Sequence, residues 1–394
     1  MRGAETIIVG GGPAGTAAAI RLAAAGRDVL LIERTAAPHH KVCGEFLSVE
    51  TQTILRRLGI DLAKQGAVPI DRVDIHAGRG RAGGALPFLA LSLSRHRLDA
   101  TLLERAVQAG AQVMRGIAVQ AATREKDCWS VRCDSGEILQ AHNLVVATGK
   151  HGMRGIADTR DMSLVGLKMH LRLRPEQRYA LARRVELFML DGAYVGIEPV
   201  EEGIANLCLV MAREKAAQLG SGWLALSDHL KAAHAGLAAR IDDAELLFDK
   251  PLAVVCPAGG HVHDETEPAA YRVGDRVAHI PPFTGDGLAI AVASGALAAE
   301  HIMQGRSPAA YLAAVRALTA QPVWLAGRVS RLAANRAGRA LMVTAAALVP
   351  GLIGAVTRRT RLNRSALPMQ MQGYSYASAR AETGEGISAR SSAG

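Results

Sequence analysis

The sequence predicts an α/β fold: a Rossmann-like dinucleotide-binding domain with an inserted, mainly antiparallel β-sheet domain and a C-terminal helical region. Three observations support this prediction. A glycine-rich turn, residues 10–15 (GGGPAG), directly follows an apolar stretch at residues 6–9. Alternating or continuous apolar segments fill the middle of the chain, and alanine-rich helical segments occupy its last third. The 394 residues, 49% of them hydrophobic, suffice for two domains with a sizeable core.

The first 33 residues have the pattern of a dinucleotide-binding βαβ unit. Gly10 allows the tight turn after the strand, Gly12 lets the backbone approach a pyrophosphate, and Gly15 lets the helix at residues 14–25 lie close to the strand. The unpaired N–H groups at the start of that helix face the phosphates. Glu33 ends the second strand, where a carboxylate can accept a hydrogen bond from a ribose hydroxyl.

A second glycine-rich signature follows much later, at residues 273–275 (VGD) and 281–287 (PPFTGDG). We interpret the ordered pair of signatures as a site for bound FAD, and therefore as evidence for redox chemistry.

The remaining segments divide the chain into domains. Helices are expected at residues 48–58, 98–109, 222–235, 287–303, 308–318 and 322–337, and strands at 113–122, 130–133, 144–147, 164–173, 184–190, 193–197, 204–209 and 271–273. Residues 68–87 read as strand-like and rich in turns. The expected FAD-binding domain comprises residues 1–70, 95–160 and 268–305; the substrate-binding sheet domain, 71–94 and 161–267; the helical region, 306–368; and a disordered tail, 369–394.

The charge of the chain limits the kinds of partner that it is expected to bind. The net charge is +10, and the excess of basic residues lies near the C-terminal end of the chain. There, arginines flank apolar segments that contain few aromatic residues. That pattern excludes nucleic acid as the favoured partner and leaves two readings, an anionic membrane surface or a solvated basic helix face. The arginines concerned are Arg328, Arg331, Arg336, Arg339, Arg358, Arg359, Arg361 and Arg364.

Residues 340–356 carry no charge, but 17 residues interrupted by Pro350 and Gly351 suit an interfacial segment or a lid over an apolar channel better than a membrane span. A buried helix is the third reading. Five scattered cysteines indicate neither a disulfide framework nor a metal site, and no signal peptide is expected. We therefore expect a cytoplasmic protein, with association at the inner face of the membrane as the alternative to a freely dissolved one.

The chain resembles FAD-dependent oxidoreductases of the geranylgeranyl-reductase type. Those enzymes share a fold with aromatic hydroxylases of the p-hydroxybenzoate-hydroxylase type. The resemblance covers roughly residues 5–339. Its motifs are the nucleotide loop ending in Glu33-Arg34, then residues 41–48 (KVCGEFLS), 94–99 (SRHRLD), 147–152 (ATGKHG), 166–170 (GLKMH) and 274–287.

The resemblance implies specific cofactor contacts. Arg95, with Arg97 as the alternative, matches the arginine that reaches the FAD pyrophosphate, and Asp275 matches the aspartate that holds the ribitol. Residues 285–288 match the segment whose backbone N–H groups face the flavin pyrimidine, where a helix N-terminus favours the negative charge of reduced flavin. The implied cofactor-binding set is Gly10, Gly12, Pro13, Ala14, Gly15, Glu33, Arg34, Cys43, Gly44, Arg95, Val119, Thr148, Gly149, Asp275, Pro282, Gly285, Asp286, Gly287 and Leu288.

The chain also departs from its relatives' motifs. The hydroxylases carry Ala-Asp-Gly-x-x-Ser where this chain has residues 147–152 (ATGKHG), which puts their coupling of FAD to NADPH in doubt. The flavin halogenases' Trp-x-Trp-x-Ile-Pro is absent, which argues against halogenation. The reductases' Tyr-x-Trp-x-Phe-Pro stands here as residues 194–199 (YVGIEP), and loss of the Trp predicts a reshaped substrate pocket.

Four residues are candidates for catalysis. In the reductases the cysteine that matches Cys43 lies near the flavin, so its thiol or the Glu45 carboxylic acid is a candidate proton donor. The alternative is that Cys43 is a packing residue and Glu45 a surface acid. Lys168 and His170 share one face of a strand, where they either line the substrate cavity or lie on its water side.

The sequence therefore predicts an FAD-dependent oxidoreductase acting on a hydrophobic isoprenoid, polyketide or lipid-like molecule of the kind found in secondary metabolism. Double-bond reduction is the first reading, and aromatic hydroxylation is the second. The third is a flavoprotein that relays electrons to a quinone or a reductase partner. NAD(P)H is a candidate electron donor, no metal is expected, and the oligomeric state stays open.

Overall fold

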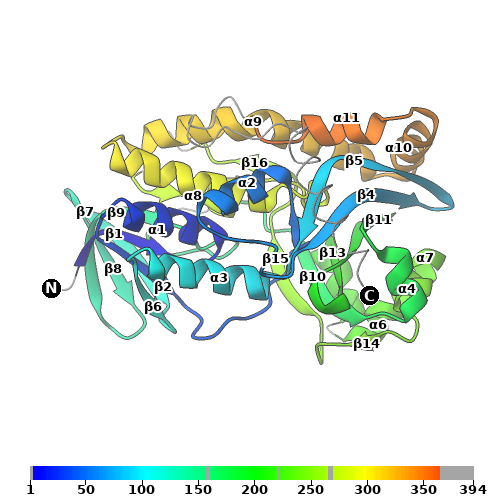
Figure 1. Cartoon of the computed structure of the whole chain (residues 1–394), viewed down its shortest axis with the longest axis horizontal. Helices are drawn as coiled ribbons and strands as arrows, with labels where there is room; N and C mark the ends of the chain where they lie inside the picture. The colour runs from blue at the N-terminus through cyan, green and yellow to red at the C-terminus, as the bar shows by residue number, and fades with distance from the viewer. Residues whose placement is uncertain (1–2, 157–159, 221, 265–268, 364–394) are drawn as a thin grey trace, which may run out of the picture.

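The structure, a computed structural model, describes residues 3–156, 160–220, 222–264 and 269–363. Two β-sheets stand side by side, with helices along one edge of both (Figure 1). The fold is mixed α/β, as the sequence predicts. The expected tail at residues 369–394 and Arg364 lie outside the described residues.

The first sheet contains the βαβ unit and has strand order β6-β2-β1-β9-β8-β7, with β17 also paired to β9. Its strands β6, β2, β1, β9 and β17 pair in parallel, whereas β7 and β8 form an antiparallel extension. The expected strand at residues 113–122 is two strands, because the backbone turns at Gly116 with a positive φ of 75°. The strands are β1 (Gly3–Val9), β2 (Val29–Glu33), β6 (Gln112–Arg115), β7 (Val119–Glu125), β8 (Cys128–Cys133), β9 (Ile138–Val146) and β17 (Tyr271–Arg272).

The second sheet has strand order β14-β10-β13-β12-β11-β4-β5-β3, with β15 also paired to β10. Only the β4–β11 pair is parallel among its described strands. One face packs on helices α6 (Trp223–Ala233) and α7 (Ala235–Ile241). The strands are β3 (Phe46–Leu47), β4 (Val68–Ala77), β5 (Gly80–Ser92), β10 (Leu164–Arg172), β11 (Arg184–Leu190), β12 (Ala193–Pro199), β13 (Ala205–Ala212), β14 (Glu245–Leu246) and β15 (Leu252–Cys256).

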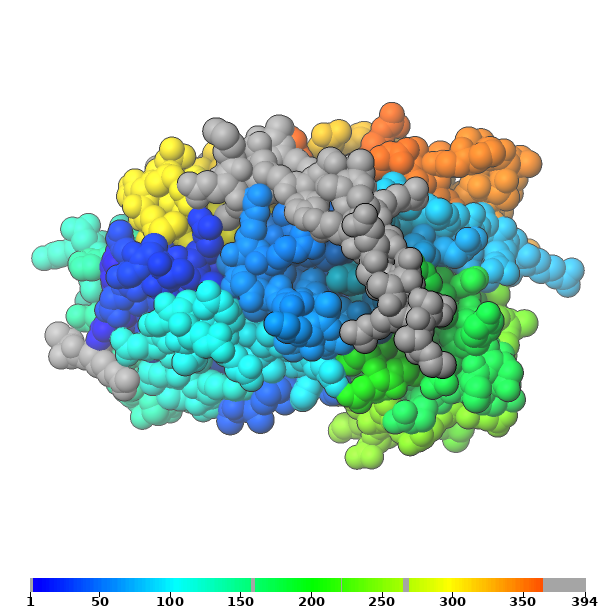
Figure 2. Space-filling model, viewed as in Figure 1, coloured from blue at the N-terminus to red at the C-terminus, as the bar shows by residue number. Residues whose placement is uncertain are grey.

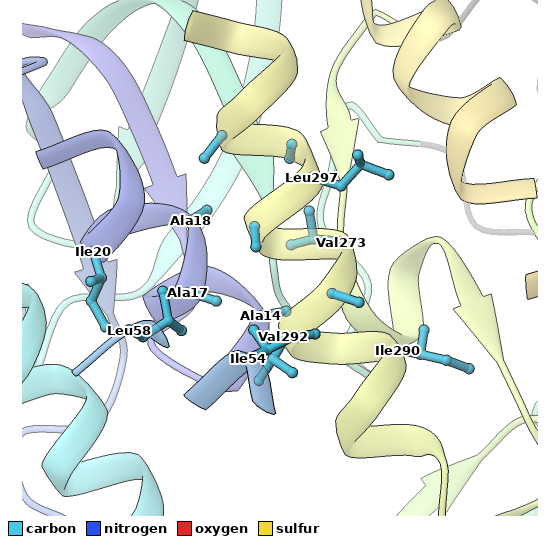
Figure 3. Packing of buried hydrophobic residues seen from close by; sticks show 14 of the residues in the cluster. Ala14, Ala17, Ala18, Ile20, Ile54, Leu58, Val273, Ile290, Val292 and Leu297 are labelled. Carbon is cyan, nitrogen blue, oxygen red and sulfur yellow. The ribbon is translucent and has the colours of Figure 1, made fainter. Parts of the chain in front are cut away.

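Small side chains hold the first sheet's helices close together. Helix α1 (Pro13–Ala24), which carries Ala14, Ala17 and Ala18, packs against α8 (Gly287–Met303), and Val292 of α8 lies beside Ala14 (Figure 3). Burial of these apolar faces stabilises the domain that positions both glycine-rich segments. The remaining helices here are α2 (Val49–Arg57) and α3 (Arg95–Gln108), and short elements complete the fold: α4 (Pro175–Leu181), α5 (Arg213–Leu219), β16 (His261–Val262) and β18 (Ala278–His279).

The C-terminal helices α9 (Pro308–Ala333), α10 (Arg336–Leu348) and α11 (Leu352–Arg359) run along one side of the molecule (Figure 1). The expectation of two helices at residues 308–318 and 322–337 was wrong. Pro322 lies inside one continuous helix, because buried residues on both sides of it, such as Val315 and Val323, pack into the core and offset the roughly 3 kcal/mol that an internal proline costs.

Helices α10 and α11 contact β5, and α10 also contacts β4. In the space-filling view the orange atoms of these helices lie above the pale-blue atoms of β4 and β5 (Figure 2). Among the described residues, no single helix is both long and apolar enough to cross a membrane. Helices α10 and α11 meet that test only as a pair, and the pair bends by 114°.

Candidate functional site

A single cavity of about 1080 Å³ runs from the glycine-rich segments of the first sheet to the underside of the C-terminal helices. We call the part lined by residues 10–14 and 274–288 the cofactor end. The part between the second sheet and helices α9–α11 is the substrate end. One cavity therefore joins the two sheets, so groups bound at its two ends can meet.

The start of α1 forms the floor of the cofactor end. A Cβ atom on Gly12 would come no nearer than 3.8 Å to any atom beyond its chain neighbours, and that atom is Nη2 of Arg95, which also lines the cavity. A Cβ on Gly15 would lie 2.0 Å from the Gly10 carbonyl oxygen, so only glycine fits there. Gly12 therefore leaves space for a ligand, whereas Gly15 allows close packing.

Arg95 is well placed to meet a pyrophosphate beside Gly12. Its guanidinium forms a two-point ion pair with Asp99, with N–O distances of 2.7 and 2.8 Å, and Asp99 also pairs with Lys41 at 2.9 Å. These bonds fix the guanidinium in orientation. Arg97, the alternative, instead pairs with Glu201 and Glu202 and does not line the cavity.

Glu33 holds the glycine turn and also lines the cavity. Its Oε2 accepts a hydrogen bond from the Gly11 N–H at 2.7 Å, and its Oε1 accepts from Thr35. Burial alone would raise the pKa of Glu33, but the Thr35 hydroxyl, the Lys41 charge and the Gly11 amide lower it overall. The carboxylate is therefore anionic at neutral pH, as an acceptor for ribose hydroxyls must be.

The second glycine-rich segment closes the other side of the cofactor end. The N-terminus of α8 opens onto the cavity at Gly287 and Leu288, and no side chain caps it. Asp286 lines no part of the cavity: its buried carboxylate pairs with Arg361 at 2.7 Å. Any contact it makes with a flavin would therefore come from its backbone.

Nearly all the remaining predicted cofactor residues line this cavity. Asp275 lies 3.8 Å from Lys150 and 3.6 Å from His279; burial would raise the pKa of its carboxyl, but Lys150 and His279 lower it well below the usual range. Two helix N-termini, a glycine turn without side chains and two anionic carboxylates fit an FAD molecule. The other lining members of the predicted set are Pro13, Ala14, Arg34, Cys43, Gly44, Val119, Thr148, Gly149, Pro282 and Gly285.

Glu45 lies where the two ends of the cavity meet, and it is fully buried. Its φ of 58° is in the left-handed region, which is uncommon for a residue other than glycine. Three groups hold it there. His170 Nε2 lies 2.9 Å from Oε2, and Lys168 Nζ and the Arg95 backbone N–H bond to Oε1. The reading of Glu45 as a surface acid is wrong.

Lys168 and His170 are buried behind Glu45 and do not line the cavity. Burial would raise the pKa of Glu45, but the charge on Lys168 and the bond from His170 lower it. His40 completes the cluster, with ligand atoms of His40, Glu45 and His170 within 4.8 Å of one another. Lys168 already neutralises this carboxylate, which leaves a cation little to gain there. Lys168 and His170 therefore hold Glu45 in position, and they do not lie on the water side of the strand.

The sequence analysis missed Glu198. On β12, Val195 and Ile197 pack into the core, so the alternate residues Tyr194, Gly196 and Glu198 line the cavity. Glu198 stands where the reductases' motif has Phe, and a carboxylate at an apolar motif position was the signal that could have revealed it.

The substrate end is almost entirely apolar. Its floor is the cavity face of β4, β5 and β11, and its roof is formed by α9, α10 and α11. These helices therefore cover an apolar channel, as the expected lid would, and the lid role itself stays a prediction. Floor residues are Val73, Ile75, Leu86, Val185, Leu187 and Met189; roof residues include Val329, Leu332, Leu341, Met342, Ala345, Leu352, Ile353 and Val356.

Comparisons with known proteins agree with this geometry. Residues 3–161 match the family described as FAD binding domain. The chain is 27% identical over 338 residues to menaquinone reductase of Mycolicibacterium smegmatis, which covers 77% of each protein. It is 29% identical over 318 residues to digeranylgeranylglycerophospholipid reductase 2 of Methanopyrus kandleri, covering 75% of this chain and 76% of that protein.

Among solved structures, the flavin-dependent brominase Bmp2 superposes with a TM-score of 0.76 over 97% of this chain and 98% of its own, at 18% identity. That likeness shows the fold alone. The fold and the cofactor end together define an FAD-binding flavoprotein. The protein is an enzyme, an FAD-dependent oxidoreductase, and it is similar over about three quarters of its length to these two reductases.

Proposed function

We propose that this enzyme reduces a carbon–carbon double bond in a hydrophobic small molecule of the isoprenoid, polyketide or lipid-like kind. The observation that carries the proposal is the continuity of the cavity: its apolar substrate end opens directly onto the cofactor end. The two reductases among the relatives have names that refer to a quinone and to an isoprenoid lipid, which supports the same substrate class.

The residues have distinct parts in this proposal. FAD, once bound and reduced, supplies a hydride. Gly12, Arg95 and Glu33 would hold its nucleotide half, and the α8 N-terminus would stabilise negative charge on its ring. The apolar floor and roof would bind the substrate and exclude water from the reacting atoms.

We further propose that substrate reaches the cavity from an anionic membrane surface. The outer face of α9–α10 exposes apolar side chains, and the Arg328 guanidinium lies 5.1 Å from the centre of the Trp324 ring. Helices α9, α10 and α11 also carry exposed arginines, which suits an interfacial contact with anionic lipid. The exposed apolar residues outside the cavity lining are Trp324, Leu348 and Val349, and the exposed arginines are Arg328, Arg331, Arg336, Arg358 and Arg359.

The experiment is a single turnover without oxygen. FAD-loaded protein is reduced with dithionite and mixed with menaquinone or with a geranylgeranyl lipid, and the product is analysed by mass spectrometry. We expect at least one of these substrates to reoxidise the flavin and to give a product two hydrogen atoms heavier, the gain lying in a ring or tail double bond.

Two other outcomes would replace this proposal with an alternative. A product that gains one oxygen atom, formed only in air, would identify an aromatic hydroxylase. Reoxidation by the quinone that leaves every tail double bond intact and requires a protein electron donor would identify an electron relay.

A further inference from the structure

Two buried carboxylates approach the junction of the two cavity ends, and their surroundings differ. Glu45 is held by Lys168, His170 and the Arg95 N–H. Glu198 faces the same junction from β12: its Oε1 lies 3.9 Å from where a Cβ on Gly44 would be. Glu198 is 3% exposed and has no ion-pair partner among the described residues.

The hydrogen bonds around Glu198 indicate which oxygen is free. Asn206 donates from Nδ2 to the Glu198 Oε1 at 3.4 Å and to the Cys43 carbonyl oxygen at 3.1 Å. Oε1 is therefore the acceptor. No hydrogen bond to Oε2 is found within the described part of the chain, so Oε2 is the oxygen free to carry a proton, on a residue that lines the cavity.

The charges nearby keep that proton in place. Burial, followed by the negative charge of Glu45, raises the pKa of Glu198 well above its usual range, against weaker opposing effects of Asn206 and Lys168. Lys168 is bonded to Glu45, and Cys208, whose thiol pKa burial raises to about 12, adds no charge at neutral pH. One carboxyl of the pair is thus anionic and the other neutral, a separation typical of acid–base sites.

We propose that Glu198 is the proton donor of this enzyme and that the double bond it helps to reduce is conjugated to a carbonyl or quinone oxygen. This inference rests on the proposed function. A weak, neutral acid suits an oxyanion that forms as the hydride arrives, because such an oxygen is basic. An isolated alkene offers no basic atom to such an acid.

The step balances with reduced FAD as the reductant. A hydride adds to the conjugated carbon, the carbon–carbon π bond breaks, and its electron pair shifts to the carbonyl oxygen. That oxygen takes the proton from Glu198 Oε2, which gives an enol with the hydride hydrogen on carbon. The enol tautomerises to the saturated carbonyl compound or, when the substrate is a quinone, a proton moves from that carbon to the second carbonyl oxygen and gives a hydroquinone. Glu198 is left as a carboxylate and regains its proton from solvent, while the substrate gains two electrons and two hydrogens.

The first test needs no turnover. We expect the melting temperature of Glu198→Gln, minus that of wild type, to rise as pH increases above about 4.3, the usual value for Glu. The sign follows from linkage: a group with a raised folded pKa costs no stability below its unfolded pKa and increasing stability above it, until the folded pKa is passed. The amide of Gln is neutral throughout, so the variant avoids that cost. A difference that stays constant with pH would overturn the proposal.

Glu186→Gln is the matched control for that test. It lies on the neighbouring strand but pairs with Arg240 at 2.7 Å, so its substitution breaks an ion pair and should destabilise the protein at neutral pH. A gain for Glu186→Gln equal to that for Glu198→Gln would mean that the pH effect is not specific to Glu198, which would overturn the assignment.

The second test measures the half-reactions by stopped flow. We expect Glu198→Gln to slow substrate-dependent flavin reoxidation by roughly 10²–10⁴, with flavin reduction by dithionite unchanged and partial rescue in Glu198→Asp. Wild type should reduce an enone-containing or quinone substrate and not an isolated alkene of equal length. A larger loss in Cys43→Ser than in Glu198→Gln, or equal rates on both substrates, would overturn the proposal. If wild type reduces neither substrate, the proposed function fails, while the pH test still decides the protonation of Glu198.

Discussion

The two ends of the cavity are lined by different kinds of group: backbone at one end and side chains at the other. The cofactor end consists mainly of backbone, with Gly12, the N-terminus of α8 and a few fixed charges such as Arg95. The substrate end consists of side chains that alternate along strands, such as Val73 and Leu187, under a helical roof. Backbone geometry tolerates few residue types, whereas a side-chain lining can change its shape with one substitution. The cofactor end should therefore respond sharply to substitution and the substrate end in a graded way.

The largest expected effect is at Gly12. In Gly12→Val the backbone, with φ of −76° and ψ of 179°, accepts a branched residue, but the side chain fills the space that faces Arg95. We expect complete loss of bound FAD in a protein that still folds. Flavin absorbance of the purified variant, together with its circular dichroism, measures both.

Gly222→Val is the control for Gly12→Val. Gly222 also precedes a helix as its N-cap, in a similar extended backbone conformation, and a Cβ there meets no atom within 4 Å. It lies outside the cavity lining and should keep its full FAD content. Equal flavin content in the two variants would contradict the proposed cofactor end.

The next effect is at the substrate end. Gly196→Trp restores the reductases' motif residue; its Cβ would make ordinary contacts with Leu187 Cδ2 at 3.6 Å and the Cys208 carbonyl at 3.8 Å. We expect FAD to be retained and the KM for a large substrate to rise about 10- to 100-fold, the 1–3 kcal/mol typical of overpacking. Gly196→Ala is the control. A loss of FAD in Gly196→Trp would show that the two ends are not separable.

A smaller effect is expected at Glu33. Glu33→Ala removes the acceptor for the Gly11 N–H and for a ribose hydroxyl, which should weaken FAD binding by about 1–3 kcal/mol. Titration of the apoprotein with FAD measures this change. Glu33→Gln keeps an acceptor and should lose less. Wild-type affinity in Glu33→Ala would remove this residue from the site.

The smallest effect is expected outside the cavity. Leu348→Glu places a charge on the roof's outer face, where the leucine is 75% exposed; Leu224→Glu on α6 is the control, because Leu224 is also 75% exposed. We expect only Leu348→Glu to weaken sedimentation with phosphatidylserine vesicles at low salt, several-fold. Equal binding of both variants would remove the membrane contact.

The comparison also explains how far the sequence predicts the fold. Residues 3–33 and the helix Gly287–Met303 were predictable because glycines, alternating strands and alanine-rich helices obey local rules. The continuous α9 was not, because tertiary burial overrides the local effect of Pro322. The prediction of one strand at residues 113–122 was wrong for a local reason, because the turn at Gly116 was not recognised in the sequence.

The candidate site shows the same division. Gly12, Arg95 and Asp275 could be placed from motifs, since each contact depends on one residue type at one spacing. The roles of Lys168 and His170 could not, because they depend on Glu45, which is more than a hundred residues away in the chain. The motif position could have drawn attention to Glu198, but its surroundings could not be predicted, because its partner Asn206 lies on the neighbouring strand and its place in the lining depends on the cavity.

Arg361 connects the roof of the substrate end to the loop at the cofactor end. It follows α11, pairs with Asp286 and donates a hydrogen bond to the Thr284 carbonyl oxygen at 2.6 Å. The roof and the loop beside the flavin site are thus tied together directly. A displacement of α11 that admitted a long molecule would pull on the loop at residues 282–287, and it would thereby link the residence time of the cofactor to the arrival of substrate. A roof that opens rarely would keep the cofactor in place between turnovers.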